Sequence, residues 1–270
     1  MRIARTIGAL RELREGLHGG FEIGLVPTMG ALHAGHIALL EAARNESDTV
    51  VASIFVNPAQ FGPGEDYDTY PRDETDDIPT AEAEGVDFLF IPTVEEMYPE
   101  GFQTWVEVEG LTQGLEGAAR PGHFRGVATA CLKLFNIVRP HRAYFGQKDA
   151  QQAAVVEQLV RDLELGIEIR ILPTIRDEDG LALSSRNALL SPEERAAAAA
   201  ALPRSLLAGQ DAYAHGQDPV AAAREILSSE PVLALEYLET ARFDGRFHLL
   251  AAARAGRIRL IDNVLLEGDL

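Results

Sequence analysis

The sequence predicts an α/β fold, in which a doubly wound parallel sheet is followed by a smaller C-terminal α+β domain. Continuous apolar segments such as Val50–Val56, typical of strands buried on both faces, alternate with helical segments over residues 1–175. After residue 176, alanine-rich helical sequence precedes three strand-like segments without helices between them. We therefore predict a Rossmann-like domain at 1–175 and a smaller helical and antiparallel-sheet domain at 176–270.

Composition limits the classes of partner. The chain has 270 residues, 46% of them apolar, and a net charge of −18. Such a charge repels nucleic acid and anionic membranes, so we expect neither as a partner. There is no signal-peptide pattern and no run of eighteen apolar residues, so no membrane span is expected. The single cysteine, Cys131, excludes a disulfide framework, and a cytoplasmic location fits best.

Hydrophobic periodicity and turn residues predict the elements of the first domain. Strands are expected at Phe21–Pro27, Val50–Val56, Val86–Pro92, Trp105–Gly110, Arg142–Gly146 and Ile167–Arg176. Helices are expected at Thr6–Leu17, Val127–Val138 and Ala150–Leu163. Another helix should end near Asn45, and a further one should end with Thr80–Gly85. Gly62–Asp77 mixes glycine, proline and acid without periodicity, which favours a mobile surface flap.

The second domain should begin with a helix at Ser191, where Pro192 and Glu194 follow in a capping arrangement. A second helix is predicted at Pro219–Leu227. The three strand-like segments that follow are 235–243, 246–255 and 257–266.

The stretch Val26–Asn45 is organised as a strand end, a tight turn and a helix. A helix N-terminus exposes unpaired N–H groups and partial positive charge, which suits an anionic phosphate. His33 and His36 lie on the same side of that first turn, so both can donate to one phosphate chain. Gly30 and Gly35, which lack Cβ atoms, would let a ligand lie against the backbone.

Other interpretations of this turn compete with a phosphate site. The histidines can be ordinary surface residues. A zinc site of the HExxH type is disfavoured, because HAGH has a different spacing and no glutamate. The turn lacks the GxGxxG spacing of dinucleotide sites, and the chain contains no GxxxxGK[ST] motif. A nucleotide-phosphate site of another design remains.

Further polar groups follow strands or stand in loops. Asn57 and Gln60 come after one predicted strand, and Lys148 and Asp149 after another, at the edge where open α/β sheets bind ligands. Gln152 falls on the same helix face as Asp149.

Ser184, Ser185 and Arg186 offer two hydroxyls and a guanidinium suited to phosphate oxygens. Paired serines can also cap a helix, but the predicted helix begins later, at Ser191. Arg120, His123 and Arg125 form a positive cluster in an acidic chain, for which a solvated loop is the alternative.

Five motifs, in order and spacing, resemble those of the pantothenate synthetases: VPTMGALHAGH, SIFVNPAQF, RPGHFRGV, YFGQKDAQQ and LSSRN. The resemblance implies ATP-dependent condensation of (R)-pantoate with β-alanine, through a pantoyl adenylate, with release of AMP and pyrophosphate. It also implies Mg²⁺ and a homodimer.

By this resemblance His36, His33, Lys148 and Arg186 are catalytic, with His36 the proton donor. ATP would contact Met29, Gly30, Ala31, Leu32, His33, Ala34, Gly35, His36, Gly146, Gln147, Lys148, Asp149, Ile175, Leu183, Ser184, Ser185 and Arg186. Pantoate would contact Gln60, Gln152, Met29 and Arg120; Gln60 would also serve β-alanine, and Asp76 and Asp77 would hold Mg²⁺ when the flap closes.

Two other functions compete with this one. Another HxGH nucleotidyltransferase or acyl-adenylate-forming enzyme would act on a different small substrate, but then Gln60 and Gln152 would have no evident purpose. A non-catalytic nucleotide sensor would bind ATP without forming AMP. The acidic charge and the lack of an anticodon-binding extension disfavour a tRNA-binding synthetase.

Overall fold

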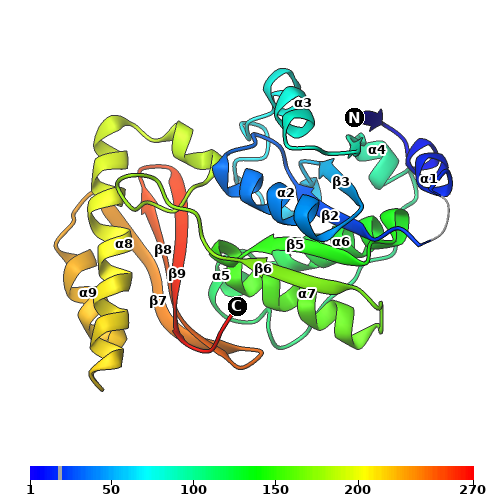
Figure 1. The fold of residues 1–270 in the computed structure, drawn as a ribbon. Coiled ribbons are helices and arrows are strands. Elements are labelled where there is room, and N and C mark those ends of the chain that lie inside the picture. Colours follow the sequence, from blue (N-terminus) through cyan, green and yellow to red (C-terminus); the bar gives the residue numbers. More distant parts are fainter. Residues whose placement is uncertain (18–19) are drawn as a thin grey trace. The chain divides into compact units, whose positions relative to one another are not determined.

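Figure 1 shows the computed structural model, which describes residues 1–17 and 20–270. The chain divides into two compact units: Met1–Phe145 with Gln152–Leu172, and Gly146–Gln151 with Pro173–Leu270. Across the part of the chain that the structure describes, no helix has both the length and the apolar character needed to span a membrane.

The first unit contains a parallel sheet, as predicted, and the sheet has six strands, of which β1 (Arg2–Ala4) was not predicted. Its strands are β1 (Arg2–Ala4), β2 (Ile23–Thr28), β3 (Thr49–Ile54), β4 (Phe88–Phe90), β5 (Arg142–Gly146) and β6 (Glu168–Leu172). Their order is β1-β4-β3-β2-β5-β6. The chain thus moves from β2 toward one edge and returns to add β5 and β6 on the other side. In such sheets, ligands bind beyond the carboxyl ends of strands at this switch point, here β2 and β5.

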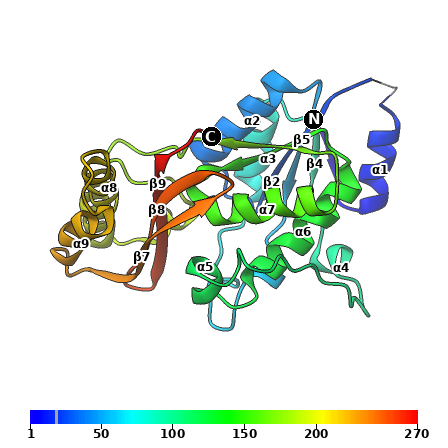
Figure 2. The ribbon, with the colours of Figure 1, turned by 90° about the horizontal axis from the view of Figure 1, so that it is seen from below.

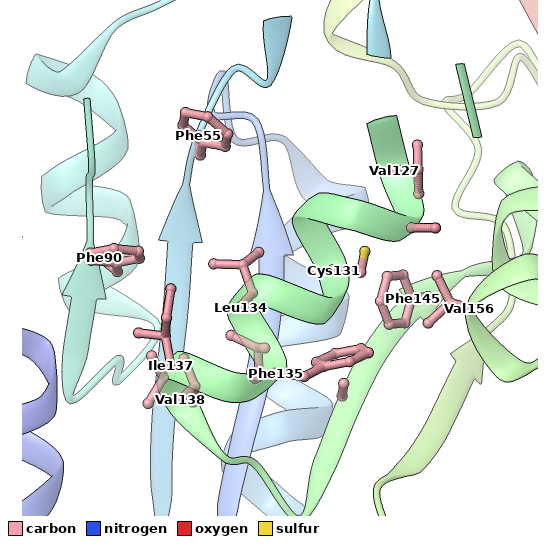
Figure 3. Packing of buried hydrophobic residues seen from close by; sticks show 14 of the residues in the cluster. Phe55, Phe90, Val127, Cys131, Leu134, Phe135, Ile137, Val138, Phe145 and Val156 are labelled. Carbon is pink, nitrogen blue, oxygen red and sulfur yellow. The ribbon is translucent and has the colours of Figure 1, made fainter. Parts of the chain in front are cut away.

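Helices cover both faces of this sheet (Figure 1). The helices of this unit are α1 (Ile7–Glu15), α2 (Ala34–Glu46), α3 (Glu74–Ala83), α4 (Val94–Met97), α5 (Leu115–Ala119), α6 (His123–Val138) and α7 (Ala150–Asp162). One hydrophobic core joins α2 and α3 to the strands, and another joins α1, α6 and α7 to the opposite face. In Figure 3, Cys131 and Leu134 of α6 lie in the second core with Phe145 and Val156. Cys131 is buried in this core, and its burial raises the pKa of the thiol to about 12.

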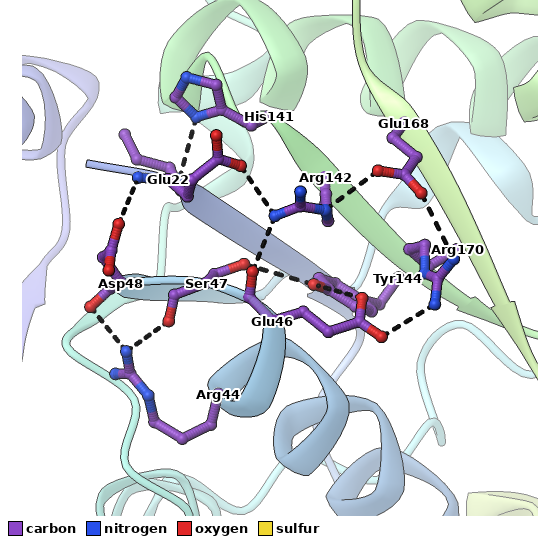
Figure 4. A network of polar contacts seen from close by, with 11 residues as sticks. Glu22, Arg44, Glu46, Ser47, Asp48, His141, Arg142, Tyr144, Glu168 and Arg170 are labelled. Carbon is purple, nitrogen blue, oxygen red and sulfur yellow. Dashed lines mark hydrogen bonds and ion pairs between the residues drawn. The ribbon is translucent and has the colours of Figure 1, made fainter. Parts of the chain in front are cut away.

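A polar network joins the amino ends of the strands (Figure 4). Arg142, which opens β5, pairs with Glu22 before β2 at 2.8 Å and with Glu168 of β6 at 3.0 Å. Arg170 pairs with Glu46 at the end of α2 at 2.9 Å. These pairs tie the strands together at their amino ends, opposite the carboxyl ends of β2 and β3 that precede His33 and Gln60.

The second unit contains a three-stranded antiparallel sheet with two helices on one face (Figures 1 and 2). Its strands are β7 (Leu233–Phe243), β8 (Arg246–Ala255) and β9 (Ile258–Glu267), and its helices are α8 (Pro192–Ala214) and α9 (Pro219–Ser228). The Ser191 hydroxyl accepts from the Glu194 N–H at 3.2 Å, and the Glu194 carboxylate accepts from the Ser191 N–H at 2.8 Å. This capping box starts α8 where the sequence predicts it.

Two predicted elements of the first unit are wrong. Trp105–Gly110 is not a strand: its backbone runs beside α6, where the Val106 N–H bonds to the Thr129 hydroxyl at 3.0 Å instead of to a neighbouring strand. The predicted flap at 62–77 extends too far. Its last residues already form the first turn of α3, which begins at Glu74 with the Asp73 carboxylate as its N-cap.

Candidate functional site

Both histidines of the predicted phosphate site help to start α2. His33 is the N-cap, and its Nδ1 accepts from the Gly35 N–H at 3.1 Å. Nδ1 of His36 accepts in turn from the His33 N–H at 3.4 Å, and the two ring centroids are 4.1 Å apart. A ring nitrogen that accepts a hydrogen bond is unprotonated, so each neutral imidazole carries its proton on Nε2. The start of α2 therefore carries an Nε2–H on each of two neighbouring imidazoles, while the Gly35, His36 and Ile37 N–H groups bond to His33.

The loop between β2 and α2 is held by Asp77 of α3. The Asp77 carboxylate accepts from the Ala31 N–H at 2.8 Å and from the Leu32 N–H at 2.7 Å, one bond to each oxygen. Ala31 has φ +49°, a left-handed conformation that a residue with a Cβ adopts only at a cost. Burial raises the pKa of Asp77, and the two loop amides oppose that rise. Asp77 thus fixes the turn from which the histidines follow.

The glycines of this loop are required by atoms of the protein itself. A Cβ on Gly30 would lie 2.8 Å from Oδ2 of Asp77, and a Cβ on Gly35 would lie 2.9 Å from Cε1 of His33. Gly30 also has φ +86°, in the region that favours glycine. The close approach expected for a ligand is therefore already made by Asp77 and the His33 ring.

The predicted magnesium ligands differ in their surroundings. Asp76 is exposed in the first turn of α3, whereas Asp77 is only 3% exposed and both of its oxygens are bound by loop amides. Asp77 therefore does not fit the expected role of a flap carboxylate free to hold Mg²⁺. Among residues 1–17 and 20–270, no group of three or more His, Cys, Asp or Glu side chains is arranged to hold a metal ion.

Gln60 and Met29, both predicted to contact pantoate, lie together. Gln60 ends the 3-10 turn η1 (Pro58–Gln60), and its Nε2 donates to Sδ of Met29 at 3.1 Å. Its Oε1 accepts from Nδ2 of Asn57 at 3.0 Å. Asn57 is 2% exposed and is itself fixed by the Tyr98 hydroxyl at 2.8 Å and the Gly126 carbonyl at 3.1 Å. The Gln60 side chain is therefore oriented before any ligand binds.

Arg120 acts on Gln60 through the main chain. Its guanidinium donates two bonds to Glu65, at 2.8 and 2.7 Å, and one to the Gln60 carbonyl at 3.2 Å. The same carbonyl is 2.8 Å from Nδ1 of His123, which must be the donor, so Nε2 of His123 accepts from Arg120 at 3.2 Å. The expected contact of Arg120 with pantoate stays a prediction. In the structure, Arg120 instead supports the backbone of Gln60.

The charges in this cluster are fixed near neutral pH. Burial would raise the pKa of Glu65, but the hydrogen bond and charge of Arg120 outweigh it and lower that pKa to about 2. Burial and the Arg120 charge lower the pKa of His123 to about 4. Glu65 is thus ionised and His123 neutral, as the bonds to Arg120 require.

Replacing Gly126 by alanine is expected to displace the turn that carries Gln60. The new Cβ would lie 2.2 Å from the Ala59 carbonyl oxygen, so the backbone must shift, at a cost of about 1–3 kcal/mol. Thermal unfolding and the KM for pantoate measure the two effects, a lower Tm and a higher KM. Gly114→Ala is the matched control, because a Cβ there meets no atom within 4 Å. Equal behaviour of the two variants would contradict the tight contact.

The second unit holds the other predicted residues except Gln152. Gly146 precedes η2 (Gln147–Asp149), where Nζ of Lys148 lies 3.6 Å from the Asp149 carboxylate. Ile175 and Leu183, both predicted to contact ATP, are joined by a backbone bond of 3.0 Å. Gln152 lies half-buried in the first turns of α7, in the first unit.

Ser184 does cap a helix, contrary to expectation. The short 3-10 helix η3 (Ser185–Leu189) begins directly after it, and its hydroxyl oxygen accepts from the Arg186 N–H at 3.3 Å. So short a helix lacks the periodicity that predicts longer ones. Because an oxygen that accepts can still donate its own proton, capping leaves the Ser184 O–H able to bind a phosphate.

Comparison with known proteins gives consistent matches over the whole chain. The family model described as Pantoate-beta-alanine ligase matches residues 2–265. The pantothenate synthetases of Herpetosiphon aurantiacus and Chloroflexus aggregans are 49% and 52% identical, with 97% and 98% of this chain and 100% of each relative covered.

Solved structures agree with this result. A pantothenate synthetase from Thermus thermophilus matches with a TM-score of 0.94 at 48% identity, covering 99% of this chain and 100% of the other. A pantoate-beta-alanine ligase from Francisella tularensis, complexed with Beta-gamma ATP and Beta-alanine, matches with a TM-score of 0.84 at 38% identity, covering 100% of this chain and 99% of the other.

Proposed function

The chain belongs to the pantoate-beta-alanine ligase family, and from this we propose that it condenses (R)-pantoate with β-alanine at the expense of ATP, giving pantothenate, AMP and pyrophosphate. The observation that supports this best in the molecule itself is the start of α2, where His33 and His36 each present an Nε2–H. Two neutral donors and a helix N-terminus suit a chain of phosphates. The relative complexed with Beta-gamma ATP and Beta-alanine supports two of the three substrates.

The first step is a displacement at phosphorus. A carboxylate oxygen of pantoate forms a bond to the α-phosphorus of ATP, and the bond from that phosphorus to the bridging oxygen of pyrophosphate breaks. Negative charge spreads over the α-phosphate and the leaving group, so catalysis consists of positioning and of donors placed where that charge develops. The product is pantoyl adenylate.

The second step is acyl transfer. The neutral amine of β-alanine forms a bond to the acyl carbon of the adenylate, loses a proton, and AMP leaves with the electron pair of the broken bond. The product is the amide pantothenate. Gln60 is proposed to bind β-alanine as well as pantoate, since its amide can both donate and accept.

Each predicted residue has a role in this scheme. Gln60, Gln152 and Met29 hold pantoate, with Arg120 on the same side of the site. His33, His36, Lys148, Ser184, Ser185 and Arg186 donate to phosphate oxygens, and Gly146 and Asp149 meet the ribose. The other contacts to ATP are assigned to Met29, Gly30, Ala31, Leu32, Ala34, Gly35, Gln147, Ile175 and Leu183.

Mg²⁺ is proposed to arrive with ATP as part of the substrate, since magnesium at such sites is held mainly by phosphates and water with one or two carboxylates. Asp76 remains the candidate carboxylate. Three further proposals are a homodimer, a cytoplasmic location and a domain division at 175 and 176. The first rests on the resemblance in sequence, the second on the single cysteine, and the third on the pattern of helices and strands in the sequence.

Gln60→Ala is expected to raise the KM for pantoate far more than the KM for ATP. The change removes the amide that Asn57 orients, and losing such a bond costs about 1–3 kcal/mol of substrate binding. Steady-state rates with each substrate varied in turn measure this. Gln158→Ala, on the exposed side of α7, is the matched control. An equal loss for both substrates would mean that Gln60 only supports the structure.

A further inference from the structure

Asn263 of β9 holds the turn that carries Lys148. Its Nδ2 donates to the Gln147 carbonyl at 2.9 Å and to the Lys148 carbonyl at 3.0 Å. Its Oδ1 accepts from Nε2 of Gln147 at 3.3 Å. Asn263 is 2% exposed, so water does not compete for these bonds. Gly146–Gln151 accordingly belong to the same compact unit as β9.

The backbone and the side chain of Asn263 are both fixed by further hydrogen bonds. Its N–H donates to Asp262, whose carboxylate binds Arg176 at 2.6 and 3.0 Å, and Nδ1 of His248 lies 3.3 Å from Oδ1. Burial lowers the pKa of His248 to about 4, so the ring is neutral and donates from Nδ1. Both amide protons and both lone pairs of the Asn263 side chain are used. The amide orientation is fixed, because its NH₂ faces two carbonyl oxygens.

We propose that Asn263 is a positioning residue for Lys148. The inference rests on the proposed function, in which Lys148 donates to the phosphates. Two successive carbonyls held by one amide fix the peptide planes on both sides of the Lys148 Cα, and so the direction in which its side chain leaves the turn. No motif of the sequence marks this asparagine, which lies 115 residues from Lys148.

Asn263→Asp tests this inference with an isosteric change. A carboxylate oxygen would replace the NH₂ group and face two carbonyl oxygens, which repels the turn instead of holding it. Because a displacement of about 1 Å at a reacting group can cost about 10²-fold, we expect pantoate-dependent exchange of pyrophosphate into ATP to fall by about that factor. Asn136→Asp is the matched control, since Asn136 is exposed on α6 and its Nδ2 donates to the Leu132 carbonyl at 3.0 Å.

A second readout separates positioning from a loss of folded protein. The chain has two lysines, Lys133 and Lys148, so labelling with an amine reagent can be followed at each by mass spectrometry. ATP should protect Lys148 in the wild type and in Asn136→Asp but not in Asn263→Asp, with Lys133 as the internal reference. Normal exchange in Asn263→Asp, or reduced exchange with protection intact, would overturn the proposal.

Asn263→Ala applies the same two readouts if the aspartate variant does not fold, because it removes both donors without adding charge. Full exchange and full protection in that variant would also overturn the proposal. If the wild type shows no pantoate-dependent exchange, the proposed function fails, and protection of Lys148 by ATP still tests the positioning role.

Discussion

Lys148→Ala is expected to lower pantoate-dependent exchange of pyrophosphate into ATP by about 10²–10³-fold, the cost of removing one donor from the charge that develops in a transition state. The lysine side chain is 19% exposed, at the turn that follows β5. Its main chain is held by Asn263, so the change should leave the fold intact. Initial exchange rates and circular dichroism measure the two effects.

Lys133→Ala is the matched control, because it removes the other lysine of the chain. Nζ of Lys133 lies 5.0 Å from the ring centroid of Phe102, which is not a predicted site residue. We expect its exchange rate to stay within about twofold of the wild type, as for most surface changes. A Lys148→Ala variant that is as active as this control would remove Lys148 from the catalytic residues.

Asp77→Asn is expected to lower exchange by about 10²-fold, because it displaces the histidine turn. Each oxygen of Asp77 accepts one loop N–H, and an asparagine offers one oxygen and one NH₂. One of the N–H groups of Ala31 and Leu32 would then face a donor. Exchange rates over a range of ATP concentrations measure the loss.

The same variant separates support of the loop from metal binding. If Asp77 held Mg²⁺, a higher Mg²⁺ concentration would restore exchange in Asp77→Asn; we expect no restoration. Asp68→Asn, on the exposed segment before α3, serves as the control and should keep wild-type activity. Recovery of Asp77→Asn with Mg²⁺ would return this carboxylate to the metal site.

The sheet and its helices were largely predictable because their signals are local. Continuous apolar strands and the Ser191 capping pattern each lie within a few residues. The failure at Trp105–Gly110 has a physical cause: Val106 and Val108 pack against a core, which gives the alternation of a strand without a neighbouring strand to pair with. At α3, Asp73 and the acidic residues after it form a helix-start signal that outweighs the loop-like composition of the segment.

The residues that support the site were not predictable in this way. Asp77 binds a loop 45 and 46 residues away, and Asn263 binds a turn more than a hundred residues away, so no local spacing reveals either contact. Glu65 pairs with Arg120 over 55 residues. Motifs predict which residues contact substrate, whereas the partners that orient those residues depend on the tertiary fold.

The most direct test of the proposed reaction is exchange of labelled pyrophosphate into ATP with (R)-pantoate present and β-alanine absent. We expect exchange that depends on pantoate, because a reversible acyl-adenylate step needs no amine. Measurable ATP binding without exchange would contradict the proposed reaction and favour a nucleotide sensor. Exchange that appears only with another acid would keep the adenylate chemistry and contradict pantoate as the substrate.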